Sequence, residues 1–126
     1  MTSLTTTRSK NYPLNDGFFQ SVLKAAFGEV IPEHKFHPKR KWRIDFFIPQ
    51  LRVGIEIEGG IWRGGRHNHP AGFMKDIEKY NTAALMGIIL YRVPAPDTKS
   101  AVKIFEHVNR LRYYLIEKRD INGEED

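Results

Sequence analysis

Alternating apolar and polar residues mark two neighbouring strands in the middle of the chain. In Lys41–Ile48 every second residue is large and apolar, and in Leu51–Glu58 branched apolar residues alternate with Gly54, Glu56 and Glu58. A period of two is that of a β-strand, whose successive side chains point to opposite faces. Only a short turn at Pro49 and Gln50 separates the two segments. They are therefore expected to pair as an antiparallel hairpin.

Helical spacing of apolar residues appears on both sides of this hairpin. The first helix is expected to start at Asn15 or Asp16 and to end at Phe27, before Gly28, with Phe18, Val22 and Ala25 or Ala26 recurring along it. A second is expected over Phe73–Met86, with Ile77, Tyr80, Ala84 and Leu85 at helical spacing and Gly87 as its stop. A third, amphipathic helix is predicted for Ala101–Lys118. Two further strands are predicted, Val30–His37 and Gly87–Val93.

The resulting order α, β, β, β, α, β, α predicts an α/β fold with a mixed sheet flanked by helices, including a C-terminal helix. The strand after the second helix should run parallel to an earlier strand, because a helix crossover joins them. A length of 126 residues with 40% hydrophobic content suits one domain. We assign it to residues 15–119, between a flexible arm (1–14) and a polar acidic tail (120–126).

Acidic residues fall where the predicted hairpin would bring them together. Pairing through the turn would place Asp45 nearly opposite Glu56, with Glu58 on the same face. Like charges opposed on a sheet are destabilising unless a cation lies among them. Mg²⁺ prefers carboxylate oxygens and, in phosphodiester hydrolysis, lowers the pKa of the attacking water. The pattern therefore predicts a Mg²⁺ site for phosphodiester hydrolysis, with Mn²⁺ as an alternative ion.

Other interpretations of the acids stay open. The strands could simply have a solvated polar face, as antiparallel sheets commonly do, although Phe47 and Gly54 on that face argue against it. A fourth acid could come from the preceding strand, where Glu33 is spaced to join Asp45, and Glu29 is its rival.

Net charge and composition narrow the class of protein. A net charge of +5 and a pI near 9.6 favour a polyanionic partner such as DNA. The chain has no Cys, no apolar stretch long enough for a membrane helix and no signal-peptide pattern at its start. A cytoplasmic location, with no membrane partner, is expected.

Asp45, within Arg43–Phe47, and Glu56-Ile57-Glu58 resemble the signature of the PD-(D/E)XK nuclease superfamily, an Asp on one strand and (D/E)-X-K on the next. The run Ile-Glu-Ile-Glu-Gly-Gly-Ile-Trp is most similar to small phage and bacterial endonuclease-like domains related to very-short-patch repair endonucleases, and Holliday junction resolvases share the core. The resemblance covers about residues 16–93. It implies an αβββαβ restriction-endonuclease-like core and, if the chain is phage-encoded, a location in the bacterial host cell.

The resemblance also implies roles for individual residues. Asp45 and Glu56 would bind the metal with the carbonyl of Ile57, and Glu58 would hold a second metal or orient a metal-bound water. Glu33 would bind a metal directly or through water. The chain departs from the family at Glu58, where relatives usually have Lys. Lys75 and Lys79, one turn apart on the following helix, are the candidates to replace it, with Lys79 preferred.

Basic residues border the predicted site on both sides. The loop from Gly59 to Gly72 contains Arg63, Arg66, His67 and His69, of which His67 could contact phosphate or take a proton. Without Cys, the two histidines do not make a convincing zinc site. At the start of the first strand of the hairpin, Lys39, Arg40, Lys41 and Arg43 could hold the DNA backbone without reading its sequence.

Together these features predict a Mg²⁺-dependent DNA endonuclease that selects branched DNA such as Holliday junctions and works as a homodimer making two cuts. One alternative is an endonuclease that nicks mismatched DNA. Another is a non-catalytic nucleic-acid-binding module that has lost the motif lysine, and a third is an accessory protein-interaction domain.

Overall fold

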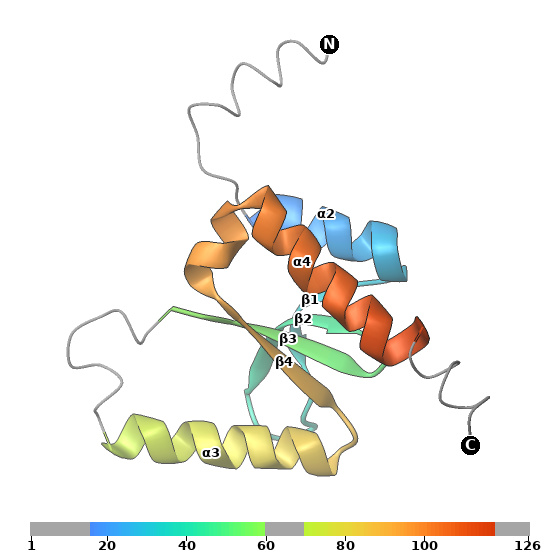
Figure 1. Cartoon of the computed structure of the whole chain (residues 1–126). Coiled ribbons are helices and arrows are strands. Elements are labelled where there is room, and N and C mark those ends of the chain that lie inside the picture. The colour runs from blue at the N-terminus through green and yellow to red at the C-terminus, as the bar shows by residue number, and fades with distance from the viewer. Residues whose placement is uncertain (1–15, 60–69, 118–126) are drawn as a thin grey trace. The chain divides into compact units, whose positions relative to one another are not determined.

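The computed structural model describes residues 16–59 and 70–117, and it confirms an α/β fold with a four-stranded mixed sheet and a helix near its C-terminal end (Figure 1). The elements are α2 (Asp16–Phe27), β1 (Ile31–Lys35), β2 (Arg43–Ile48), β3 (Val53–Glu58), α3 (Pro70–Leu85), β4 (Ile89–Pro94), a 3-10 helix (Ala95–Lys99), α4 (Ala101–Arg112) and a closing π-helical turn (Tyr113–Glu117). No helix in this part of the chain is long and apolar enough to cross a membrane.

The described residues fall into two compact units. One contains residues 27–95, with the whole sheet and α3, and the other joins residues 16–26 to residues 96–117. Every strand and the helix that follows β3 thus belong to the first unit, which also holds all the acidic candidates.

The sheet has the order β1-β2-β3-β4. Strands β2 and β3 form the predicted antiparallel hairpin, with Ile48 opposite Val53 and Phe46 opposite Ile55. The next step of this register brings Asp45 toward Glu56, as the sequence predicts. Strand β4 runs parallel to β3, which confirms the crossover through α3.

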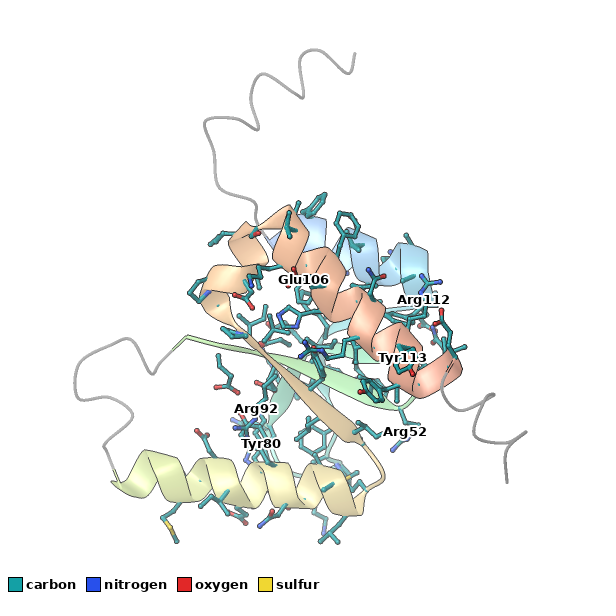
Figure 2. All side chains as sticks on the ribbon, viewed as in Figure 1. Arg52, Tyr80, Arg92, Glu106, Arg112 and Tyr113 are labelled. Carbon is teal, nitrogen blue, oxygen red and sulfur yellow. The ribbon has the colours of Figure 1, made fainter. Side chains whose placement is uncertain are left out.

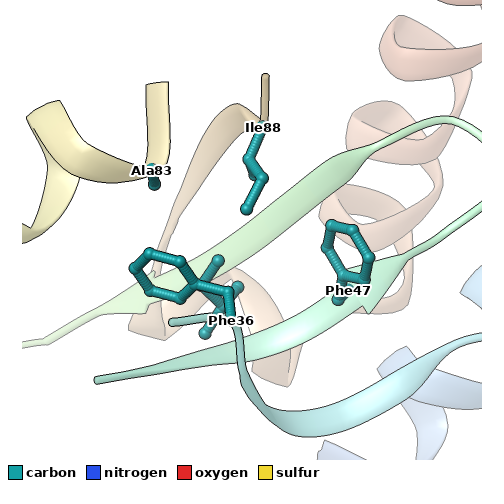
Figure 3. Close-up of a cluster of buried hydrophobic side chains, with 5 residues drawn as sticks. Phe36, Phe47, Ala83 and Ile88 are labelled. Carbon is teal, nitrogen blue, oxygen red and sulfur yellow. The ribbon is translucent and has the colours of Figure 1, made fainter. Parts of the chain in front are cut away.

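Helix α3 packs on one side of the sheet in the same unit (Figure 1). Ala83 enters a buried cluster with side chains from the strands and from the loop before β2, drawn in Figure 3. The cluster contains Phe36, Ile44, Phe47, Ala83 and Ile88, with Ile31, Trp42 and Leu90 against it. This contact fixes which face of α3 meets the sheet.

That face differs from the one that the apolar residues of α3 predict. Ala83 is buried and Tyr80 is half-buried, but Ile77 and Leu85 are exposed, Leu85 by 88%. The helix also begins at Pro70, inside the predicted glycine-rich loop, rather than at Phe73. Proline is well suited to the first turn of a helix, where its missing N–H has no partner to lose.

Gly54 allows close packing over the middle of β3. A Cβ added there would lie 3.0 Å from Cγ2 of Ile44 and 3.2 Å from Cδ2 of Leu90. Those distances are shorter than ordinary van der Waals contact, so the sheet uses glycine to let these side chains lie against its backbone.

In the other unit, α2 and α4 are linked by Phe18 and Phe105, whose rings meet edge to face with centroids 6.4 Å apart. The fully buried residues of α2 are Phe19 and Leu23, one position along from Phe18 and Val22 in the predicted spacing. Helix α4 is amphipathic, as predicted, and buries Ile104, Val108 and Leu111. It begins with Ser100, whose side chain accepts a hydrogen bond from the N–H of Lys103.

Candidate active site

Asp45 is held against β3 by a hydrogen bond to the backbone. Its Oδ2 accepts the N–H of Ile57 at 2.7 Å, just past Phe46 and Ile55, the pair at this end of the hairpin ladder. The side chain thus takes the place of a backbone carbonyl at the point where regular pairing ends. This bond fixes the Asp45 carboxylate beside the Glu56–Ile57 segment, as the metal-site prediction requires.

Glu56 is the one acidic residue that is buried in the described part of the chain, with 7% of its surface exposed. An ammonium from α3 approaches it: Nζ of Lys79 lies 3.2 Å from Oε2 of Glu56. Both side chains are largely shielded from water, at 17% exposed for Lys79 and 9% for Glu56. A charge pair in such surroundings interacts more strongly than one at the surface.

The pKa of Glu56 is raised from its ordinary 4.5 to about 7. Burial is the largest cause, and the negative charges of Asp45 and Glu58 raise the pKa further, whereas Lys79 lowers it. Burial and the neighbouring carboxylates therefore disfavour the ionised form of Glu56, and Lys79 offsets this only in part. A further positive charge beside Glu56 would favour the ionised form.

Glu58 is directed toward a second cation. Its Oε2 lies 3.6 Å from Nε of Arg92 on β4 and accepts a long hydrogen bond of 3.4 Å from the hydroxyl of Tyr80 on α3. The Arg92 guanidinium stacks over the Tyr80 ring, 4.1 Å from its centroid, and Figure 2 shows the two residues beside each other. Burial, followed by the charges of Glu56 and Glu58, raises the pKa of Tyr80, so its hydroxyl stays a hydrogen-bond donor.

The acidic groups meet the needs of a hard divalent cation, but not as a closed cage. Within residues 16–59 and 70–117 no three His, Cys, Asp or Glu side chains come together as a metal-binding group. Asp45 and Glu56 offer two neighbouring carboxylates. Mg²⁺ is commonly bound by one or two carboxylates while it keeps waters and substrate phosphates. Two neighbouring carboxylates, of which Glu56 is poorly hydrated, fit Mg²⁺.

The other acidic and lysine candidates lie apart from these contacts. Glu33 has a left-handed backbone (φ +49°), and its side chain is 65% exposed, 4.0 Å from Arg43. Glu29 is exposed. Lys75 is also exposed and lines a shallow hollow on α3 with Met74 and Ile77. Of the two lysine candidates, Lys79 is the one that the structure brings to the carboxylates.

The basic segment before β2 is ordered by local contacts. Nδ1 of His37 accepts the backbone N–H groups of Lys39 and Arg40 at 3.1 and 3.0 Å. The Arg40 guanidinium lies 3.9 Å over the Trp42 ring and 2.9 Å from Glu78, the neighbour of Lys79 on α3. Lys39, Arg40, Lys41 and Arg43 are all exposed. The predicted DNA-contacting segment therefore lies beside the helix that supplies Lys79.

Three predicted residues, Arg63, Arg66 and His67, lie outside the described residues. Conversely, sequence reasoning gave no role to Arg92 and treated Tyr80 as an apolar helix residue. The register of β4 against β3 would have identified Arg92, because Arg92 pairs with Glu56 across the parallel strands. A helix crossover predicts parallel pairing but not its register, so the sequence did not place Arg92 beside the acids.

No family model, curated protein or solved structure matches the chain.

Proposed function

We propose that this chain is a Mg²⁺-dependent DNA endonuclease of the PD-(D/E)XK type. The observation that carries the proposal is the ion pair between buried Glu56 and Lys79, next to Asp45. It combines two hard oxygen ligands with a nearby ammonium, which is the arrangement needed to hold a divalent ion and an anionic phosphodiester together.

Each residue has a distinct task in this proposal. Asp45 and Glu56, with the Ile57 carbonyl, would hold Mg²⁺, which when bound lowers the pKa of water and neutralises charge on the phosphate. Lys79 takes the part of the motif lysine and stabilises the negative charge that develops on the phosphate oxygens as water attacks. Lys79 supplies this cation from helix α3, because the motif position on β3 is occupied by the acidic residue Glu58.

The proposed substrate class rests on the charge of the protein. The net charge of +5 and the exposed basic segment from Lys39 to Arg43 suit the DNA backbone. The basic side chains provide phosphate contacts rather than base readout. We therefore propose selection by DNA structure, with branched molecules such as Holliday junctions as substrates and a homodimer as the active form.

The test is cleavage of supercoiled plasmid, linear duplex and synthetic four-way junctions, with Mg²⁺, Mn²⁺ or a chelator. We expect metal-dependent nicking that is strongest on junctions and is lost in Glu56→Gln and Asp45→Asn. Asparagine keeps an oxygen that can accept the Ile57 N–H, so the second variant separates loss of the metal ligand from loss of strand pairing. Absence of cleavage on every substrate with either metal would overturn the proposal.

A competing function is a non-catalytic DNA-binding module. The observation that favours it is that Lys79 and Arg92 already pair with Glu56 and Glu58. In that case the two ion pairs would only stabilise the fold, and calorimetry would show no Mg²⁺ binding that depends on Glu56. Metal binding lost in Glu56→Gln would exclude it.

A further inference from the structure

Arg92 has a geometry that a purely structural ion pair does not require. Its guanidinium carbon lies over the Tyr80 ring, 4.1 Å from the ring centroid, while Nε lies 3.6 Å from Oε2 of Glu58. Stacking on an aromatic ring fixes the plane of a guanidinium and leaves its N–H groups directed outward along that plane. Tyr80 is in turn held by its own hydrogen bond to Glu58.

The Arg92 side chain is also accessible. It is 52% exposed, whereas Lys79, the other cation of the cluster, is 17% exposed. Arg92 pairs in register with Glu56, so it lies on the strand next to the proposed metal ligand. A ligand in solution can therefore reach this cation beside the carboxylates without opening the core.

The charges of the cluster indicate which ligand would bind there. When Asp45, Glu56 and Glu58 are all ionised, their charges exceed those of Lys79 and Arg92 by one negative charge, and a bound divalent ion reverses this to one positive charge. A phosphodiester carries a single negative charge and planar pairs of oxygens that match the fork of a guanidinium. With a divalent ion bound, this group of charged side chains would therefore attract one backbone phosphate.

We propose that Arg92 binds a backbone phosphate of the DNA next to the metal site, exchanging its contact with Glu58 for the phosphate oxygens. This inference rests on the proposed function, because it takes DNA as the ligand. Arg92 is a substrate-binding residue, and Tyr80 is a positioning residue that holds the plane of the guanidinium. No covalent bond changes in this step.

The test measures binding rather than cleavage. Fluorescence anisotropy with a labelled four-way junction, in Ca²⁺ to limit cleavage, gives the dissociation constant over a range of KCl concentrations. For Arg92→Ala we expect binding to weaken on the order of tenfold, and the slope of log K against log salt to fall by about 0.9, the value of one phosphate contact. Arg92→Lys should keep the slope and recover part of the affinity.

The matched control is Arg52→Ala. Arg52 is also exposed and lies over an aromatic ring, 5.7 Å from the centroid of Phe47, but it precedes β3 at the end of that strand opposite to Glu58. This variant should leave the slope unchanged. Tyr80→Phe keeps the ring under Arg92 and should bind DNA nearly as wild type, whereas Tyr80→Leu should weaken binding without changing the slope.

The outcomes separate this inference from the proposed function. An unchanged slope in folded Arg92→Ala, with only a lower melting temperature, would show a structural ion pair and overturn the role of Arg92. A lower slope in a protein that cleaves no DNA under any metal would keep the phosphate contact and overturn the endonuclease. If Arg92→Ala does not fold, Arg92→Gln and Arg92→Lys decide the question.

Discussion

Replacement of Lys79 by Met tests the centre of the proposed site. The change removes an ammonium 3.2 Å from Glu56 and keeps a chain of similar length in a position that is 17% exposed. Lys79 is the main influence that lowers the pKa of Glu56 against burial. Without it, the pKa of Glu56 must rise above the present value of about 7.

The expected size of the effect follows from proton competition. Metal binds the ionised carboxylate, so each pKa unit above the working pH weakens binding about tenfold. Because the pKa of Glu56 already lies near 7, any further rise weakens Mg²⁺ binding at pH 7 by this factor per unit, a loss that shrinks at pH 9. Cleavage should fall further, by about 10²- to 10³-fold, because charge stabilisation at the phosphate is lost as well.

Isothermal titration calorimetry at pH 7 and pH 9, with cleavage rates at saturating Mg²⁺, measures both effects. The matched control is Lys75→Met, one helical turn away and exposed, which should bind Mg²⁺ and cleave as wild type. The reasoning is refuted if Lys79→Met keeps wild-type Mg²⁺ affinity and cleavage, or if both variants lose activity equally.

Three further outcomes are expected. Folding raises the pKa of Glu56 from 4.5 to about 7, so the contribution of this group to the stability of the metal-free protein is greatest below pH 4.5. The free energy of unfolding should fall by up to about 3 kcal/mol as the pH rises through 7. Urea unfolding at several pH values measures this fall, which should vanish in Glu56→Gln. Gly54→Ala should destabilise the fold by about 1–3 kcal/mol in the same assay, and an unchanged midpoint would contradict the close packing over β3. Arg40→Ala should cost less than about 1 kcal/mol of stability, since its pair with Glu78 is exposed, yet lower the salt slope of DNA binding by about 0.9; an unchanged slope would show that Arg40 only buttresses Trp42.

The strands could be predicted because their information is local. The alternation in β2 and β3 and the short turn between them determine both the pairing and the register that brings Asp45 toward Glu56. The parallel strand β4 follows from the crossover rule alone. These features depend on residues close together in the sequence, or on topology.

The helix faces could not be predicted in the same way. In α3 the apolar residues Ile77 and Leu85 point to solvent, while Lys79 and Tyr80 turn inward, because Glu56 and Glu58 on the sheet attract a cation and a hydroxyl. A pattern read from hydrophobicity alone assigns such a helix the wrong face. The search for a lysine on this helix came from the resemblance to the nuclease superfamily and not from the periodicity of the helix, and the structure brings Lys79 to Glu56.

The paired charges at Glu56 and Glu58 have a consequence for how the chain matures. A small zinc domain needs its metal in order to fold, because nothing else balances its ligands. Here Lys79 and Arg92 already lie against these carboxylates, so we expect newly made chains to reach their native conformation in a cell depleted of magnesium. In the proposed endonuclease the ion would bind to an already folded protein, so the supply of Mg²⁺ would change the rate of DNA cleavage and not the amount of folded protein.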